Sequence, residues 1–215
     1  MAPATYHQGM PVERYGVTPR TARAAMILLH GRGAMAVDIL ALAREFHAPR
    51  MAFLAPQAAN ATWYPNRFIA PVASNEPWLS SALVVIDDLI ASLLAAGLTH
   101  DQIFLLGFSQ GGCLAIEYAA RTPRRYAAVI GLSAGLIENG DQPRAYTGSL
   151  AGTPVLLGCS DVDLHIPLVR VERSAQLFAE LGAAVDKRIY PGMGHTVNQD
   201  EIDAVQRLLD RIEAP

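Results

Sequence analysis

The stretch Ile103-Phe-Leu-Leu-Gly-Phe-Ser-Gln-Gly-Gly-Cys113 decides the fold of this chain. Its first residues form a short apolar run typical of a buried strand, and the residues after the serine favour an apolar helix. Between them, Gly107-Phe-Ser109-Gln-Gly111 has the Gly-x-Ser-x-Gly spacing of a sharp strand-to-helix turn. The glycines leave room for neighbouring backbone, so such a turn can lift the serine hydroxyl above the sheet. We therefore predict a strand over 103–108, a helix over 110–121 and a nucleophilic Ser109 between them.

Strand-like and helix-like segments alternate along the rest of the chain. We predict further strands at 25–29, 51–55, 127–132, 154–159 and 185–190, and further helices at 36–47, 80–96, 171–181 and 201–212. This alternation implies right-handed crossovers and a mostly parallel central sheet with helices on both faces. Ligands of such α/β sheets bind beyond the carboxyl ends of the strands. We expect a single domain over residues 1–215, without a large lid domain.

A base and an acid for Ser109 are expected later in the chain, each in a loop that follows a strand. His195 ends Gly192-Met-Gly-His195 after the last predicted strand, and it has the most suitable position of the six histidines. His7, by contrast, is expected in a frayed terminus. The base needs a carboxylate to orient it, and Asp161 and Asp163 both follow the preceding strand. Spacing alone does not choose between them, but the order serine, aspartate, histidine is that of α/β-hydrolases.

The loop after the predicted strand over 25–29 suits an oxyanion hole. In α/β-hydrolases one oxyanion donor is the backbone N–H after the nucleophile, and another comes from the loop after an early strand. These positions are Gln110 and, within His30-Gly-Arg-Gly33, Arg32. We therefore predict that the N–H groups of Arg32 and Gln110 stabilise the oxyanion.

Several motifs resemble the phospholipase/carboxylesterase family, which includes small bacterial carboxylesterases and acyl-protein thioesterases. They are Leu29-His-Gly-Arg-Gly33, Ala55-Pro-Gln57, Gly107-Phe-Ser-Gln-Gly-Gly112, Asp161-Val-Asp163 with Pro167, and Gly192-Met-Gly-His195. The resemblance runs from about residue 25 to the end and is most specific around the serine.

The resemblance implies an α/β-hydrolase fold and a serine hydrolase without a cofactor. Its substrate would be a small-molecule carboxylic ester, with a short to medium acyl chain, or a thioester, cleaved through an acyl-enzyme on Ser109. Asp163 would be the catalytic carboxylate and Asp161 would support it. The chain departs from the family at Ala34, Ser160, Leu164 and His165, which leaves the substrate open.

A long loop over 56–79 is rich in aromatic residues, among them Phe68. We predict that Trp63, Tyr64 and Trp78 line a substrate pocket, with plain packing as the alternative. The resemblance places Trp63 and Tyr64 at an aromatic pair that borders the active site in the family. His165 is assigned to the substrate-binding set near the leaving group, with a surface position as the alternative.

The sequence leaves two alternative functions to consider. A dienelactone-hydrolase-like enzyme would usually carry a cysteine in the elbow, and Ser109 argues against it. A non-catalytic binding module on a hydrolase scaffold would usually lack a triad member, and none is missing here. A metal site formed by Asp161, Asp163 and His165 is also conceivable, but with an intact serine triad we expect no metal, and added chelator would test this.

Composition narrows the partners. The chain has 215 residues, a net charge of −3 and no basic stripe, so we expect no nucleic-acid binding. The two cysteines are expected to be buried free thiols rather than a disulfide scaffold. The longest apolar stretch, 82–98, is interrupted by Asp87 and Asp88, so we expect no stable membrane insertion and a cytoplasmic location. A homodimer is left open because the family contains dimers.

Overall fold

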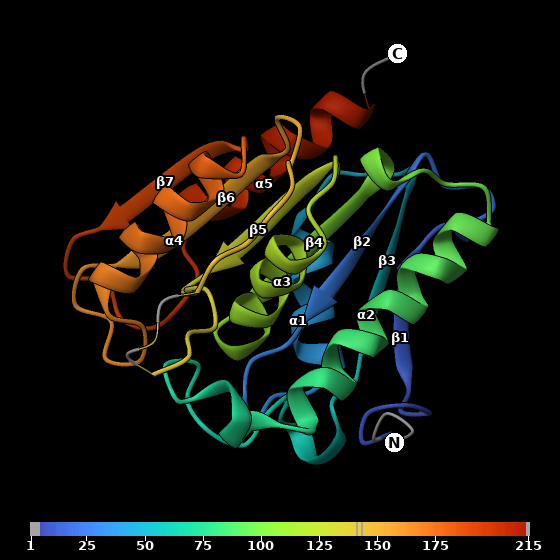
Figure 1. Cartoon of the computed structure of the whole chain (residues 1–215). Helices are drawn as coiled ribbons and strands as arrows, with labels where there is room; N and C mark the ends of the chain where they lie inside the picture. The colour runs from blue at the N-terminus through green and yellow to red at the C-terminus, as the bar shows by residue number, and fades with distance from the viewer. Residues whose placement is uncertain (1–4, 141, 143, 214–215) are drawn as a thin grey trace.

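The computed structural model describes residues 5–140, 142 and 144–213 of the chain. Within this part, the strands form one sheet in the order β1-β3-β2-β4-β5-β6-β7 (Figure 1). The strands are β1 (Val12–Gly16), β2 (Ala24–Leu29), β3 (Met51–Pro56), β4 (Ile103–Phe108), β5 (Ala128–Leu132), β6 (Pro154–Ser160) and β7 (Ala184–Tyr190). The α-helices are α1 (Ala36–Leu42), α2 (Trp78–Ala95), α3 (Gln110–Arg121), α4 (Leu168–Glu180) and α5 (Gln199–Glu213).

The predicted mostly parallel α/β sheet is confirmed. The strands from β3 to β7 in sheet order pair in parallel, and β1 pairs antiparallel with β3 at one edge, with Val12 opposite Pro56. The sequence did not predict β1. Its residues Val12-Glu-Arg-Tyr-Gly16 are half-buried or exposed, because an edge strand on this sheet needs no continuous apolar run.

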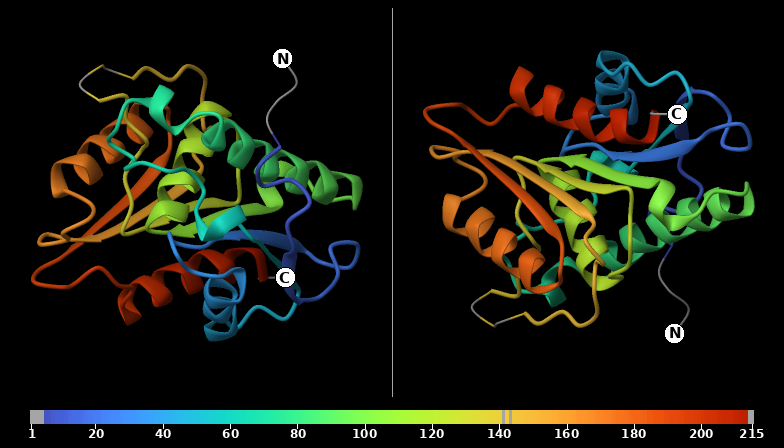
Figure 2. Two further views of the ribbon diagram at one scale, coloured as in Figure 1. Left: turned by 90° about the horizontal axis from the view of Figure 1, so that it is seen from below. Right: turned by 90° about the horizontal axis from the view of Figure 1, so that it is seen from above.

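Side chains of the central strands alternate between two cores, one on each face of the sheet. From β2, Ala25, Ile27 and Leu29 point into the core beneath α2, α3 and α4. Ala24, Met26 and Leu28 point into the core beneath α1 and α5. This period of two is the normal pleat of a strand, and Figure 2 shows the two helical layers on opposite sides of the sheet.

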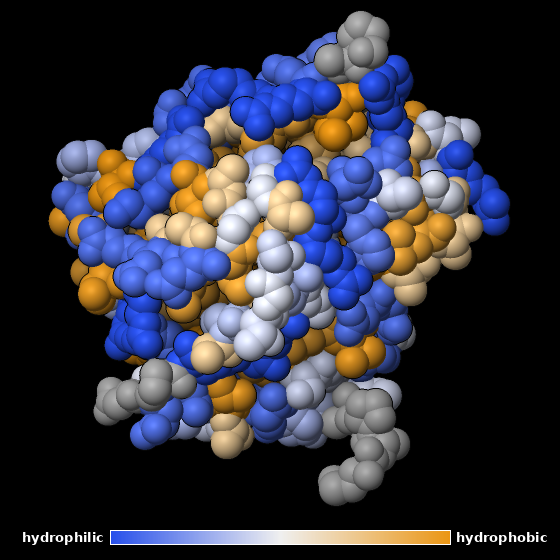
Figure 3. All heavy atoms as spheres, turned by 45° about the horizontal axis from the view of Figure 1, so that its top comes forward, coloured by the Kyte–Doolittle hydropathy of each residue, from blue (hydrophilic) through white to orange (hydrophobic). Residues whose placement is uncertain are grey.

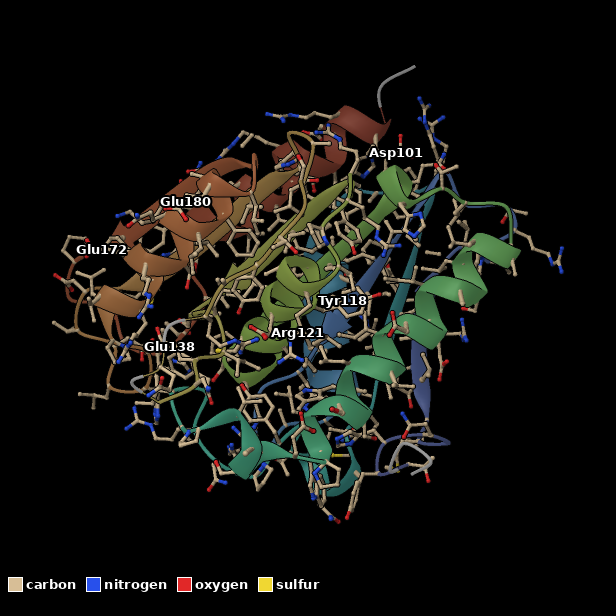
Figure 4. All side chains as sticks on the ribbon, in the orientation of Figure 1. Asp101, Tyr118, Arg121, Glu138, Glu172 and Glu180 are labelled. Atoms are coloured by element: carbon tan, nitrogen blue, oxygen red, sulfur yellow. The ribbon has the colours of Figure 1, made fainter. Side chains whose placement is uncertain are left out.

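Helix α2 is long and apolar enough to span a membrane by length and composition, with a mean hydropathy of 1.8. In the structure 44% of it is buried, and core helices of globular proteins pass the same test. Leu79, Ile86 and Leu93 pack into the core. The Tyr118 hydroxyl of α3 reaches α2 and donates to Asp87 Oδ1 at 2.5 Å (Figure 4). Asp87, expected to interrupt a membrane span, thus ties α2 to α3.

On the face drawn in Figure 3, hydrophobic residues lie in small groups between hydrophilic ones. No continuous apolar surface for a second copy of the chain stands out on this face.

The parallel strands all end at one edge of the sheet (Figure 1). The loops that follow β2, β4, β6 and β7 leave from this edge, and the predicted catalytic residues lie on these loops.

Candidate active site

Ser109 sits at a strained turn between β4 and α3. Its backbone has φ 55° and ψ −121°, a conformation that residues with a side chain rarely adopt. The turn is possible because the flanking glycines carry no Cβ. A Cβ on Gly107 would lie 2.2 Å from the carbonyl oxygen of Gly111, and one on Gly111 would lie 2.1 Å from the Leu29 oxygen. The Ser109 N–H donates to the Leu132 oxygen of β5 at 2.9 Å, which fixes the turn to the sheet.

Three side chains from three loops form a hydrogen-bonded row. The Ser109 hydroxyl lies 2.8 Å from His195 Nε2, and His195 Nδ1 lies 2.7 Å from Asp163 Oδ2. With the proton on Nδ1, His195 donates to the carboxylate and accepts from the serine. This arrangement allows the imidazole to take the serine proton while the carboxylate stabilises the resulting charge.

The Asp163 carboxylate is held ionised in a buried position. Burial of the side chain raises its pKa, but hydrogen bonds from His195 and from the N–H groups of Ile166 and His165 outweigh this effect and leave the pKa below its ordinary value. Both N–H groups point at Oδ1, at 3.0 Å from Ile166 and 2.8 Å from His165. Oδ2 is thereby left for His195.

The second aspartate of the pair faces elsewhere. Asp161 Oδ1 accepts the N–H of Gly192 at 2.8 Å, which joins the loop of Asp163 to the loop of His195. Geometry therefore separates two residues that spacing could not, and it places Asp161 in a supporting position. The two carboxylates have different partners, and the described residues contain no group of three His, Cys, Asp or Glu side chains that could hold a metal ion.

His195 is flanked by two rings. The Phe108 ring lies 4.9 Å from it and the His165 ring 4.7 Å, measured between centroids. These contacts limit rotation of the imidazole about its χ angles. His165 is exposed, as in the surface alternative, and its ring also lies beside the predicted base and lines the site.

The two predicted oxyanion donors lie on either side of the serine. Gln110 is the first residue of α3, so its N–H belongs to the turn of the helix that lacks intrahelical acceptors. Among the described residues, the Arg32 N–H has no protein acceptor, while its neighbour Gly33 donates to the Ala61 oxygen. The positive end of the α3 dipole also favours a negative charge beside Ser109.

The side chains of the same two residues hold the aromatic loop. Arg32 donates to the carbonyl oxygens of Tyr64, Pro65 and Asn66 at 2.7–2.9 Å. Gln110 Nε2 donates to Tyr64 O at 2.8 Å, and Gln110 Oε1 accepts from the Trp63 N–H at 2.9 Å. This role was not predicted, because the motifs give the positions of Arg32 and Gln110 but not their partners in a distant loop.

A cavity of about 330 Å³ opens beside Ser109. Of the predicted substrate-binding residues, Tyr64 and His165 line it. Its further lining residues are Gly31, Arg32, Ala34, Arg67, Phe68, Phe108, Gln110, Cys113, Ile166 and His195. Arg67, Phe108, Cys113 and Ile166 were not among the predicted site residues, because no local sequence pattern indicates which of these side chains face the cavity.

The prediction that Trp63 and Trp78 line the pocket is wrong. Trp63 is completely buried, and its indole N–H donates to the His30 oxygen at 2.9 Å. Trp78 stacks on Tyr6 with 4.5 Å between ring centroids, at the start of α2. The loop crosses the edge of the sheet, so its largest apolar side chains fill the space beneath it instead of facing the substrate.

The expectation of a frayed terminus at His7 is also wrong. The ring is buried, its Nε2 donates to the Trp63 oxygen at 3.0 Å, and its Nδ1 accepts the Ala59 N–H at 3.1 Å. Burial lowers the pKa of His7, which favours the neutral ring that these two bonds require. Both cysteines are buried free thiols, as predicted.

Comparisons with known proteins show the family and the fold of the chain. A family model described as Phospholipase/Carboxylesterase matches residues 17–212. The solved phospholipase/carboxylesterase of Dyadobacter fermentans has a TM-score of 0.89 and 39% identity, covering 95% of this chain and 98% of that chain. Esterase PE8 has a TM-score of 0.76 and 26% identity, covering 94% and 99%.

A curated relative is similar over a shorter region. Acyl-protein thioesterase 1 of Gibberella zeae is 31% identical over 125 residues, which is 57% of this chain and 53% of the relative. The chain thus spans about half the length of the curated relatives it matches.

Proposed function

Because the chain belongs to the phospholipase/carboxylesterase family, we propose that it is a serine hydrolase acting as a single α/β-hydrolase domain. Its substrates are carboxylic esters with short to medium acyl chains, or thioesters. The observation that carries this proposal is the hydrogen-bonded row Ser109–His195–Asp163 at the wall of a cavity. Similar proteins are named phospholipase/carboxylesterase and acyl-protein thioesterase, and these names support a hydrolase of esters or thioesters.

The proposed reaction proceeds in two steps of acyl transfer. Ser109 attacks the carbonyl carbon while His195 takes its proton, and His195 then protonates the leaving alcohol or thiol. Water next attacks the acyl-enzyme with the same assistance, which releases the acid and restores the serine. Asp163 keeps the proton of the neutral imidazole on Nδ1 and stabilises the imidazolium in both steps.

The N–H groups of Arg32 and Gln110 are assigned to the oxyanion of each tetrahedral intermediate. Backbone donors cost no reorganisation when the charge forms, and one such donor contributes about 3–4 kcal/mol to the transition state in related enzymes. The side chains of these residues act indirectly, because they fix the loop that carries Tyr64 against the cavity.

The size of the cavity supports short to medium acyl chains. A cavity of about 330 Å³ lies at the lower end of the range of roughly 300–1,000 Å³ that is typical of small-ligand pockets. Phe68, Phe108 and Ile166 provide apolar walls for such a chain.

No observation specifically supports a dienelactone-hydrolase-like enzyme or a non-catalytic binding module. The thiol of Cys113 lines the cavity, but burial raises its pKa to about 12, so it is a poor substitute for the serine nucleophile. We place the protein in the cytoplasm, where reducing conditions maintain free thiols such as the two found here.

Hydrolysis of p-nitrophenyl esters with acyl chains of two to sixteen carbons tests the proposal. We expect turnover of the shorter esters, and loss of about 10⁴-fold or more of kcat in Ser109→Ala. Ser80→Ala, at an exposed serine on α2, is the matched control and should retain wild-type activity. Full activity in Ser109→Ala would overturn the assigned nucleophile.

A further inference from the structure

We propose that Arg67 and His165 form an anion subsite at the mouth of the cavity, which binds a carboxylate on the leaving group of the substrate. This inference rests on the proposed function and deepens it. It names a substrate class, esters that combine an apolar acyl group with a leaving group carrying one negative charge.

The cavity has a charge opposite to that of the whole chain. The chain carries a net charge of −3, yet the lining includes Arg32 and Arg67 and no Asp or Glu side chain among the described residues. The Arg32 guanidinium donates to three carbonyl oxygens, which are neutral partners and leave its charge uncompensated. A cleft lined by one sign of charge concentrates ligands of the other sign.

Arg67 retains free donors at this site. Among the described residues, the side chain of Arg67 makes one hydrogen bond, from Nη2 to the His165 carbonyl oxygen at 3.3 Å, whereas a guanidinium has five N–H donors. No carboxylate among the described residues pairs with it. Elsewhere, the buried Glu117 carboxylate is paired with Arg121 and Arg144.

The position of His165 assigns the subsite to the leaving group. The His165 ring lies 4.7 Å from the ring of His195, and His195 delivers its proton to the leaving group in the proposed reaction. Phe68, Cys113 and Ile166 line the cavity as well and offer an apolar surface to the acyl group. The Arg32 guanidinium already donates to three carbonyl oxygens, so Arg67, with one side-chain hydrogen bond, is the guanidinium that can pair with the two oxygens of a carboxylate.

A matched pair of acetate esters tests the subsite. The first is 4-acetoxybenzoate, whose leaving group carries a carboxylate, and the second is its methyl ester, which is neutral. The quantity measured is kcat/KM for the anionic ester divided by kcat/KM for the neutral one. We expect Arg67→Gln to lower this ratio about fivefold or more, mainly through KM, as loss of one charged hydrogen bond at a half-open site implies.

Controls separate the local contact from general electrostatics. Arg20→Gln removes the same charge from an exposed position in the loop between β1 and β2. This loop precedes β2, whereas the cavity lies beyond the carboxyl end of β2, so the variant should leave the ratio unchanged. High salt should lower the wild-type ratio toward that of Arg67→Gln, because it screens exposed charges. An equal ratio in wild type and Arg67→Gln, or an equal loss in Arg20→Gln, would overturn the inference.

A binding measurement keeps the inference testable apart from turnover. In Ser109→Ala protein, 4-hydroxybenzoate should bind more tightly than its methyl ester, and Arg67→Gln in that background should abolish the difference. Equal affinity for the two ligands would count against the subsite. Wild-type turnover of the neutral ester without anionic preference would overturn the subsite alone, whereas Ser109-independent turnover would overturn the proposed function.

Discussion

Ser109 combines a strained backbone with an unhindered hydroxyl, and two glycines make this possible. Its positive φ of 55° orients the side chain toward His195. The cost of a residue in this region is of order 1–3 kcal/mol, and it is offset by the close backbone contacts around the turn. These contacts exist because neither Gly107 nor Gly111 carries a Cβ.

Gly111→Ala should therefore destabilise the whole protein. The new methyl carbon would lie 2.1 Å from the Leu29 carbonyl oxygen, and backbone must move to admit it. We expect a loss of about 3 kcal/mol or more, seen as a fall of roughly 6–12 °C in Tm. Gly194→Ala is the control, since a Cβ there meets no atom within 4 Å. Equal Tm values for the two variants would contradict the close approach at Gly111.

The residues of the proposed triad were indicated by the sequence, while the walls of the cavity were not. Ser109 and His195 belong to short motifs in loops after strands, so local pattern and chain order were sufficient to find them. Choosing Asp163 over Asp161 required the family resemblance, and geometry now distinguishes them. The inward or outward direction of Trp63 depends on contacts with residues more than 30 positions away, which no local pattern encodes.

Helix α5 begins with a buried carboxyl group that anchors the loop of His195. Asn198 N–H donates to Glu201 Oε2 at 2.9 Å, and the Glu201 N–H donates to Asn198 Oδ1 at 3.0 Å. This reciprocal pair is a capping box three residues after the base. Glu201 is buried against Gly158 of β6, and its Oε1 has no partner among the described residues. Burial raises the pKa of Glu201 to about 7.

The raised pKa makes stability depend on pH in a defined direction. A folded-state pKa above the unfolded value means that the folded protein binds this proton more tightly. The contribution is fully present below the ordinary pKa of about 4.5 and is lost as the pH rises through about 7. Glu201→Gln, which stays neutral, should therefore gain stability relative to wild type between pH 5 and pH 8, by up to about 3 kcal/mol.

Urea unfolding of both proteins at several pH values measures this gain. Only the difference between variant and wild type is used, so groups that titrate elsewhere in the protein largely cancel. The nearby Asp200 and Arg188 keep their charges over this range, because the pKa of Asp200 is lowered and that of Arg188 is raised. A difference that stays constant from pH 5 to pH 8 would show that Glu201 is not protonated in the folded protein.

The types of most elements, but not all of them, could be predicted from the sequence. Strands such as 103–108 are short apolar runs. In the structure both faces of this strand are buried, so the continuous apolar run correctly indicated a buried strand. Strand β1 was missed because its Glu13, Arg14 and Tyr15 are not apolar and the antiparallel pairing to β3 lies about 40 residues away. Helix α2 begins two residues earlier than predicted, at Trp78, whose ring packs on Tyr6.

At the scale of the whole molecule, the segment before β1 joins parts that are distant in sequence. The N–H groups of Tyr6 and His7 donate to Ser81 Oγ of α2 at 3.0 and 3.1 Å. The His7 ring makes hydrogen bonds to two backbone groups of the aromatic loop, the N–H of Ala59 and the carbonyl oxygen of Trp63. This segment lies outside residues 17–212, which the family model matches, yet it supports the loop whose Trp63 N–H holds Gln110 beside the nucleophile.

His7→Ala should accordingly weaken the fold without removing any catalytic group. The substitution leaves the Trp63 carbonyl and the Ala59 N–H without their present partners, so we expect a loss of about 2–4 kcal/mol in the free energy of unfolding. His47→Ala is the matched control. His47 is exposed and makes hydrogen bonds through its backbone, to Gln206, so its loss should stay within about 0.5 kcal/mol. Urea unfolding of the two variants and the wild type under the same conditions measures both losses. A similar small effect for the two variants would mean that the first residues lie on the molecule without stabilising it, and that the aromatic loop is held by Arg32 and Gln110 alone.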